Sequence, residues 1–202
     1  MDLDALFRLE CGLFLLSAKG EKDNGCIINT VMQVTAKPVQ ICTAVNKSNY
    51  THDIIAETGL FNVSVLTQQT PFSVFSDFGY QSGRQKDKFS GRTDFARSEN
   101  GIYYLTTYAN AFLSAEVKQV IALKSHTLFL AEVTEAKILS EAPSITYHYY
   151  QEKVKPQKPE IKETDKKGYI CTICGYIYEG AVLPDGYTCP VCKHGTEAFQ
   201  PI

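Results

Sequence analysis

Four of the seven cysteines stand close together near the end of the chain. Cys171 and Cys174 form one C-x2-C pair, Cys189 and Cys192 form a second, and fourteen residues separate the pairs. Each pair can make a tight turn whose thiolates converge on one ion, and two such turns complete a tetrahedron. Because four thiolates suit either a structural zinc or a single redox-active iron, the spacing predicts a metal site without choosing the metal.

The residues around these pairs resemble a rubredoxin. The first pair lies in "CTICGYIYEG", and the second lies in "LPDGYTCPVCKHGTEAF", where an "LPD" turn precedes "CPVC". The resemblance covers residues 169–202, and the short loop between the pairs is nearer to the small domain at the end of rubrerythrins. It implies one iron on the four cysteines. The aromatic residues of the tail would form the apolar shell around that iron: Tyr169, Tyr176, Tyr178, Tyr187 and Phe199.

A charged segment separates this tail from a larger body. Residues 151–167, "QEKVKPQKPEIKETDKK", contain ten charged residues and two prolines, which is typical of a solvated linker. The sequence therefore predicts a body over residues 1–150, a linker over 151–168 and a small domain over 169–202. A tail of this size needs a metal to fold, whereas the body has the length of one ordinary domain.

The body is predicted to be mainly β. Apolar, β-branched runs of strand length occupy residues 12–18, 25–35, 39–46, 60–66, 111–123 and 126–139. Short helices are expected over 2–9, over 48–59 with Gly59 as the stop, and over 70–79 with Thr70 as the cap. Many short strands with few helices favour a closed barrel or a sandwich, because closure removes exposed sheet edges.

An iron centre raises the question of what supplies its electrons. One iron carries one electron, whereas a nicotinamide delivers two as hydride, and a flavin is the common group that splits the pair. The body contains neither G-x-G-x-x-G after a strand nor G-x-x-x-x-G-K-[ST], which argues against dinucleotide binding of the Rossmann kind. A flavin bound by the loops of a barrel remains open.

Four body segments resemble the flavin reductase-like family, whose fold is an FMN-binding Greek-key split barrel. They are "NGCIINTVMQVTAKPVQICTAVNKSNYTHDIIAETGLFNVSVL", "FGYQSGRQKDKF", "HTLFLAEV" and "PSITYHYY". With its tail, the chain is similar to the high-molecular-weight rubredoxins of anaerobic bacteria. That resemblance implies electron transfer from NADH or NADPH through FMN and iron to a flavodiiron oxygen or nitric oxide reductase, or to a rubrerythrin. It also implies a homodimer.

The same resemblance, applied position by position, implies a set of FMN-binding residues. A strand would line the flavin ring, a strand end and helix start would hold the phosphate, and a loop lysine, a histidine and an aromatic residue would complete the site. In that order these are Asn29, Thr30, Val31, Gln33 and Thr35; Asn46, Lys47 and Thr51; and Lys88, His126 and Tyr149 or Tyr150. His126 would stand near the incoming donor and is the candidate catalytic residue. A helix start with nearby hydroxyl and ammonium groups is also a suitable anion site on physical grounds.

Composition narrows the class, and two other functions stay open. A net charge of −2 gives no reason to expect nucleic acid or an acidic membrane surface, and scattered cysteines fit a reducing cytoplasm. One alternative is a reductase of free flavin, in which the tail serves only as a docking module. The other is a non-redox protein in which a zinc ribbon binds a partner. Tightly bound flavin would argue against the first, and iron against the second.

Overall fold

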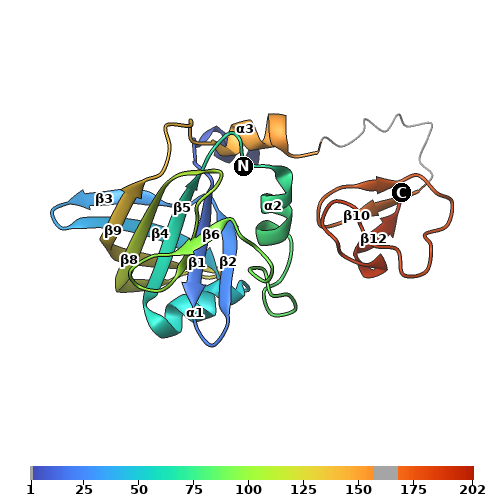
Figure 1. The fold of residues 1–202 in the computed structure, drawn as a ribbon. Helices are drawn as coiled ribbons and strands as arrows, with labels where there is room; N and C mark the ends of the chain where they lie inside the picture. The colour runs from blue at the N-terminus through green and yellow to red at the C-terminus, as the bar shows by residue number, and fades with distance from the viewer. Residues whose placement is uncertain (1, 157–167) are drawn as a thin grey trace.

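A computed structural model describes residues 2–156 and 168–202 of the chain (Figure 1). Most of the predicted linker, residues 157–167, lies outside the described residues. The body contains a seven-stranded antiparallel sheet in the order β2-β1-β5-β8-β9-β4-β3. Its strands are β1 Phe14–Lys19, β2 Asp23–Ile28, β3 Met32–Ala36, β4 Val39–Asn46, β5 Leu60–Leu66, β8 Ala109–Ala122 and β9 His126–Ile138. The mainly β fold predicted from the sequence is confirmed, although the run over 25–35 is two strands.

The sheet curls into a split barrel. β2 and β3 lie at opposite ends of the strand order, yet only residues 29–31 separate them along the chain. The four Cα steps from Ile28 to Met32 span at most about 14 Å, so the two sheet edges must approach each other. The Thr30 hydroxyl links this crossing to β4, because it donates to the Ala44 carbonyl at 2.8 Å and accepts from the Ala44 amide at 3.2 Å.

Two groups of buried side chains stabilise the body. One fills the curled sheet and includes Leu16, Phe61 and Phe129. The other includes Phe75 and Phe78 of helix α2, Phe72–Gly79, which pack with body residues such as Leu105 and Ile145. Burial of a Leu or Phe side chain stabilises the folded state by about 1.5–3 kcal/mol. These two buried groups therefore stabilise the fold of the body.

The helices lie near their predicted positions. Helix α1, Tyr50–Thr58, starts after Asn49 and ends at Gly59, whose φ of +70° allows its N–H to reach the Ile55 carbonyl at 2.9 Å. Helix α2, Phe72–Gly79, starts one residue later than predicted. Thr70 is not its cap, because the Thr70 hydroxyl donates to the Tyr108 carbonyl at 3.1 Å.

Several short elements differ from the prediction. The first helix is a tight 3-10 helix, Leu3–Arg8, and the strands β6 Phe95–Arg97 and β7 Tyr103–Leu105 form a small ribbon that the sequence did not reveal. Helix α3, Tyr147–Tyr149, continues into a π-helical turn over Tyr150–Val154. The first residues of the predicted linker, up to Val154, are thus helical and not extended. Tyr150, which is buried in the body, holds this turn in place.

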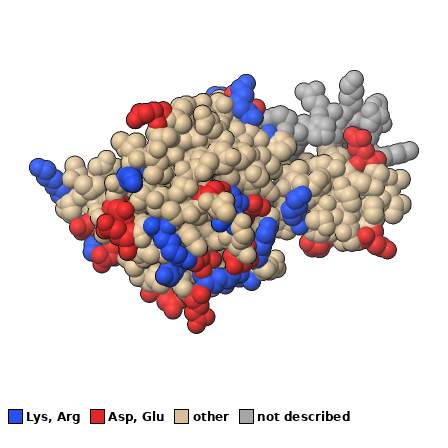
Figure 2. Space-filling model, viewed as in Figure 1, with Lys and Arg blue, Asp and Glu red and all other residues tan. Residues whose placement is uncertain are grey.

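The tail is a small domain of its own (Figure 1). Strands β10 Tyr169–Cys171, β11 Ile177–Tyr178 and β12 Phe199–Pro201 form a sheet in the order β11-β10-β12, and a 3-10 turn covers Thr196–Ala198. On the face drawn in Figure 2, acidic and basic side chains of the body are interspersed. No helix among the described residues has the length and apolar character needed to cross a bilayer.

Candidate functional site

The four predicted metal ligands lie together in the tail. Their sulfur atoms all lie within 4.8 Å of one another, with the Cys171–Cys192 and Cys174–Cys189 pairs at 3.5 Å. A tetrahedron with metal–sulfur bonds of about 2.3 Å has edges of about 3.8 Å. The sulfur cage therefore has the size that a single tetrahedral ion requires.

Two matching turns build this cage. In the first, the Gly175 N–H donates to the Cys171 carbonyl at 2.8 Å; in the second, the Lys193 N–H donates to the Cys189 carbonyl at 2.9 Å. Both residues have positive φ, +78° at Gly175 and +63° at Lys193. Lys193 thus adopts a backbone conformation that glycine adopts readily and a lysine rarely, which fixes the path of the residue that follows it.

The four buried sulfurs can all be ionised together only if a cation binds them. Burial raises the pKa of the Cys174 thiol to about 11 and also raises that of Cys192. Four thiolates this close would repel one another strongly, and a metal that binds them deprotonates each thiol. The cysteines therefore fit the iron of a rubredoxin-like domain.

The predicted apolar shell of the metal site is confirmed. All five predicted aromatic residues of the tail pack on the buried cysteine cluster, together with Leu183, Val191 and one residue of the body, Tyr80. An apolar shell of this kind limits water at the sulfurs and helps to set a reduction potential. The presence of Tyr80 was not predicted from the sequence.

A polar pocket of about 230 Å³ lies beside this contact. The start of helix α1 and the loop after helix α2 form most of its lining, and Lys88 stands in its wall. The lining residues are Asn24, Cys26, Ser48, Asn49, Tyr50, Thr51, Gly79, Tyr80, Gln81, Ser82, Gly83, Lys88 and His194. A pocket of this size suits the phosphate end of a cofactor better than a whole flavin, because pockets for complete ligands are usually larger.

Lys88 gives the pocket its charge. Its side chain is only 5% exposed, and Nζ donates to the carbonyls of Gly25 at 2.9 Å and Phe78 at 3.1 Å. An ammonium has three protons, so these contacts leave one donor for the pocket. Burial lowers the Lys88 pKa to about 8, and no ion pair of Lys88 occurs among residues 2–156 and 168–202. Together with the α1 N-terminus, this cation makes an anion site.

Two buried polar atoms beside the pocket have no hydrogen-bond partner within the described chain: Asn24 Oδ1 and His194 Nδ1. A Cβ at Gly83 would lie 1.9 Å from Asn24 Oδ1, so any larger residue there would displace the Asn24 amide. Buried polar atoms are normally paired, and unpaired ones indicate a missing ligand or water. Asn24, Gly83 and His194 were missed from the sequence, although Gly83 lies inside the quoted "FGYQSGRQKDKF".

The structure divides the predicted FMN residues into groups. Thr51 and Lys88 line the polar pocket, and the Thr51 hydroxyl accepts from Asn24 Nδ2 at 2.8 Å. Asn29, Thr30 and Val31 lie at the crossing between β2 and β3. Gln33 and Thr35 lie on β3, which is exposed along its whole length. This second group does not line the polar pocket.

A third group lies where β4 ends. Asn46 faces His126 in the β4–β9 register, and Asn46 Oδ1 accepts from the Ser48 amide and hydroxyl, both at 2.9 Å. Lys47 Nζ donates to the Leu123 carbonyl at 2.5 Å, and His126 Nδ1 lies 2.9 Å from Ser125 Oγ. Asn46 therefore orders Ser48, the first residue of the segment 48–51 that lines the pocket at the start of helix α1.

The aromatic residue at the end of the body has two candidates. Tyr149 is half-buried in the second core cluster, whereas the Tyr150 hydroxyl lies 3.0 Å from that of Tyr80. Burial raises the pKa of both Tyr80 and Tyr150, so both remain neutral donors. Tyr150 and Tyr80 also line a more apolar pocket of about 310 Å³ with Phe75 and Tyr147.

The Lys88 pKa predicts how FMN affinity depends on pH. The free protein loses the Lys88 proton above a pKa of about 8, against an ordinary 10.5, and a bound phosphate would raise that pKa again. Cys26, Asp77 and Lys86 also act on this ammonium. FMN affinity should be constant from pH 7 to 8 and then fall by up to roughly tenfold per pH unit. Fluorescence titration with FMN and riboflavin tests this, because riboflavin has no phosphate and should bind equally across the range.

Comparisons with known proteins agree with both parts of the chain. The model of the flavin reductase like domain matches residues 6–158, and that of the rubrerythrin, rubredoxin-like domain matches residues 169–200. High molecular weight rubredoxin of Moorella thermoacetica is 35% identical over the whole of both chains. A ferric-chelate reductase (NAD(P)H) of Archaeoglobus fulgidus is 34% identical over 79% of this chain and 94% of its own.

A solved structure shares the fold of the body. The NADH:FAD oxidoreductase of Streptomyces globisporus C-1027 superposes with a TM-score of 0.63 at 22% identity, covering 72% of this chain and 88% of that one. At this identity the likeness shows the fold alone. The family matches and the whole-length similarity show more: the chain belongs to the flavin reductase-like family of oxidoreductases, ends in a rubredoxin-like domain with a four-cysteine iron site, and shares this arrangement with high molecular weight rubredoxin.

Proposed function

We propose that this protein takes electrons from NADH or NADPH and passes them, through FMN in the body and iron in the tail, to a partner redox protein. One observation carries the proposal: Tyr80 lines the polar pocket of the body and also packs on the four-cysteine cluster of the tail. A site for an anionic cofactor and a site for a one-electron metal thus share a side chain. We divide the chain into a body over 1–150, a linker over 151–168 and an iron domain over 169–202.

The body residues have separate tasks in holding the cofactor. Lys88, Thr51 and the start of helix α1 would bind the FMN phosphate, with Asn46 and Lys47 ordering that start. The strand residues predicted from the family resemblance would line the ring: Asn29, Thr30, Val31, Gln33, Thr35 and Tyr149. When bound, the flavin supplies the chemistry that accepts a hydride and releases electrons singly. No side chain has to act as a nucleophile, and His126 would position the nicotinamide.

A homodimer would cover the exposed apolar side chains on β3 and the strands beside it. Large apolar side chains on β3, on β4 and near the β8–β9 turn are exposed, among them Met32 at 61% and Val120 at 55%. Isolated exposed apolar residues are ordinary, but a group on adjoining strands is typical of an interaction surface. A second copy on this surface would place its own residues against Gln33 and Thr35, which are exposed in the single chain.

The acceptor would meet the tail. A flavodiiron oxygen or nitric oxide reductase is the partner that we propose, with rubrerythrin as the other acceptor of the same class. None of the seven cysteines forms a disulfide in the described part of the chain, which is expected of a protein kept in a reducing compartment, and we therefore place the protein in the cytoplasm.

Anaerobic visible spectroscopy tests the relay. The purified protein is recorded before and after NADH or NADPH, and iron, zinc and flavin are counted on the same sample. We expect flavin bands and a ferric-thiolate band, both bleached by the nicotinamide. Bleaching of the flavin beside an unchanged iron band would contradict the relay and leave a flavin reductase. Zinc without flavin would contradict the redox function as a whole.

A further inference from the structure

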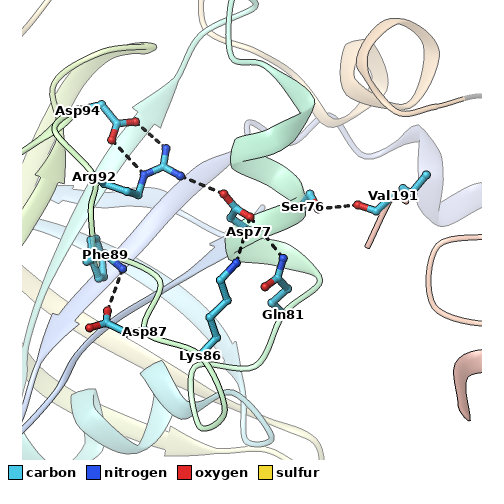
Figure 3. Close-up of polar contacts among 9 residues, drawn as sticks. All are labelled: Ser76, Asp77, Gln81, Lys86, Asp87, Phe89, Arg92, Asp94 and Val191. Carbon is cyan, nitrogen blue, oxygen red and sulfur yellow. Dashed lines mark hydrogen bonds and ion pairs between the residues drawn. The ribbon is translucent and has the colours of Figure 1, made fainter. Parts of the chain in front are cut away.

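The tail contacts the body at helix α2. Ser76 Oγ donates to the Val191 carbonyl at 2.6 Å (Figure 3). Val191 stands between Cys189 and Cys192, so this bond is made at the metal-binding turn itself. Ser76 is only 6% exposed. A serine on the outer side of a helix is ordinarily in water, and here the tail provides the partner for its hydroxyl.

Tyr80 extends this contact toward the body. It follows the last residue of helix α2, packs on the cysteine cluster, and its hydroxyl lies 3.0 Å from that of Tyr150. Because Tyr80 also lines the polar pocket, one aromatic ring lies between the pocket and the metal ligands. Nothing in the spacing of the tail cysteines requires this placement.

His194 belongs to both parts of the chain. The Cys189 N–H donates to the His194 carbonyl at 2.8 Å, so the histidine is held by the same turn that binds the metal. His194 lines the polar pocket, where the other twelve lining residues come from the body. Its buried Nδ1 has no partner among the described residues. A buried, unpaired ring nitrogen on a residue that lines an anion pocket indicates a ligand that would pair with it.

We propose that the second cysteine turn, residues 189–194, is a docking element that binds the face of α2 formed by Ser76 and Tyr80 of its own chain, and that His194 thereby completes the FMN phosphate pocket. This inference rests on the proposed function, because the pocket ligand is taken to be FMN. It assigns His194 as a binding residue and Ser76 as a positioning residue. Electron transfer makes and breaks no bond, so a docked tail serves it by shortening the path between the two cofactor sites.

The test uses the iron-loaded full-length protein and measures FMN affinity by fluorescence titration. Ser76→Arg places a long charged side chain where the tail docks, and His194→Ala removes the ring from the pocket. Each should weaken FMN binding by about fivefold, the effect of one hydrogen bond. The double variant should bind FMN no more weakly than either single variant, because both changes remove the same interaction. Ser73→Arg, an exposed position on the same helix, is the matched control and should bind FMN normally.

Hydrogen exchange gives a readout that is independent of FMN. The Ser76→Arg variant should lose amide protection at residues 72–80 and 189–194 while the rest of the barrel stays protected. Unchanged protection and unchanged FMN affinity in Ser76→Arg and His194→Ala would overturn the docking proposal. Amide protection at these residues that increases with protein concentration would mean that the tail docks on a second copy. That result would overturn the proposal that the tail docks on its own chain.

The proposed function can fail separately. If NADH and NADPH leave the iron of the unmodified protein oxidised, the relay is wrong, whatever the exchange data show. If the iron is reduced normally in Ser76→Arg, with FMN affinity and exchange also unchanged, the relay stands and the docking proposal is wrong. Circular dichroism and iron content of each variant confirm that the body and the tail are folded.

Discussion

Replacing Cys174 with serine should abolish delivery of electrons to an acceptor protein while NADH still reduces the bound flavin. Cys174 is 9% exposed, and its sulfur lies 3.5 Å from that of Cys189 within the cage. Removing a residue that hydrogen-bonds to a metal ligand already lowers metal affinity or activity about 10–100-fold, and removing the ligand itself lowers them further. We therefore expect acceptor reduction to fall on the order of 100-fold or more.

The measurements are iron content, anaerobic reduction of the flavin by NADH and reduction of an added acceptor protein. Cys42→Ser is the matched control, because it removes a half-buried thiol from β4 without touching the cage. It should behave as the unmodified protein does in all three measurements. Acceptor reduction that survives unchanged in Cys174→Ser would mean that electrons leave the body without passing through the tail.

Replacing Lys88 with methionine should selectively weaken binding of FMN. Methionine keeps most of the length of the side chain and removes the buried ammonium that faces the polar pocket. A hydrogen bond to a charged group contributes about 1.5–3 kcal/mol, so the dissociation constant of FMN should rise roughly 10–100-fold. The fall in FMN affinity above pH 8 should also disappear, because the group that titrates is gone.

Riboflavin separates this effect from general damage to the site. It lacks the phosphate, so its affinity should be nearly the same in the unmodified protein and in Lys88→Met. Lys86→Met is the matched variant, since Lys86 is a half-exposed lysine that lies 3.6 Å from Asp77 (Figure 3). It should change FMN affinity less than threefold, as exposed ion pairs contribute little. An equal loss of FMN and riboflavin binding in Lys88→Met would mean that Lys88 does not contact the phosphate.

The metal site could be read from the sequence because its geometry is local. A C-x2-C pair closes its own turn, so two pairs in one short tail specify four converging sulfurs before any packing is known. The strands were also predictable, since apolar and polar residues alternate in segments such as 60–66 with the two-residue period of a strand, although both faces of β5 are buried in the structure. Helix α1 was legible for a similar reason, because Gly59 ends it through its own backbone conformation.

The anion pocket was only partly legible. Thr51 and Lys88 were predicted. Asn24 was not, because nothing in the sequence around it indicates that this residue of β2 lines the pocket. Thr70 shows the same limit: a threonine before a proline predicts a helix cap, yet a long-range bond to the Tyr108 carbonyl takes its hydroxyl instead. Contacts between distant segments can replace a local preference whenever they satisfy the same polar group.

The sequence by itself determined a four-cysteine metal site in the tail and a β-rich body, and its resemblance to known families indicated iron and a candidate flavin-phosphate lysine. Those features depend on residue types and short spacings, which fix local turns and periodic strands. Only the tertiary structure decided that Lys88 is buried as a cation, that Asn24 and His194 meet beside it, and that Ser76 and Tyr80 receive the metal-binding turn. These contacts join segments far apart in the chain, 63 residues apart for Lys88 and Gly25 and 115 for Ser76 and Val191. They are set by how the sheet curls and where the tail packs, which no local pattern records.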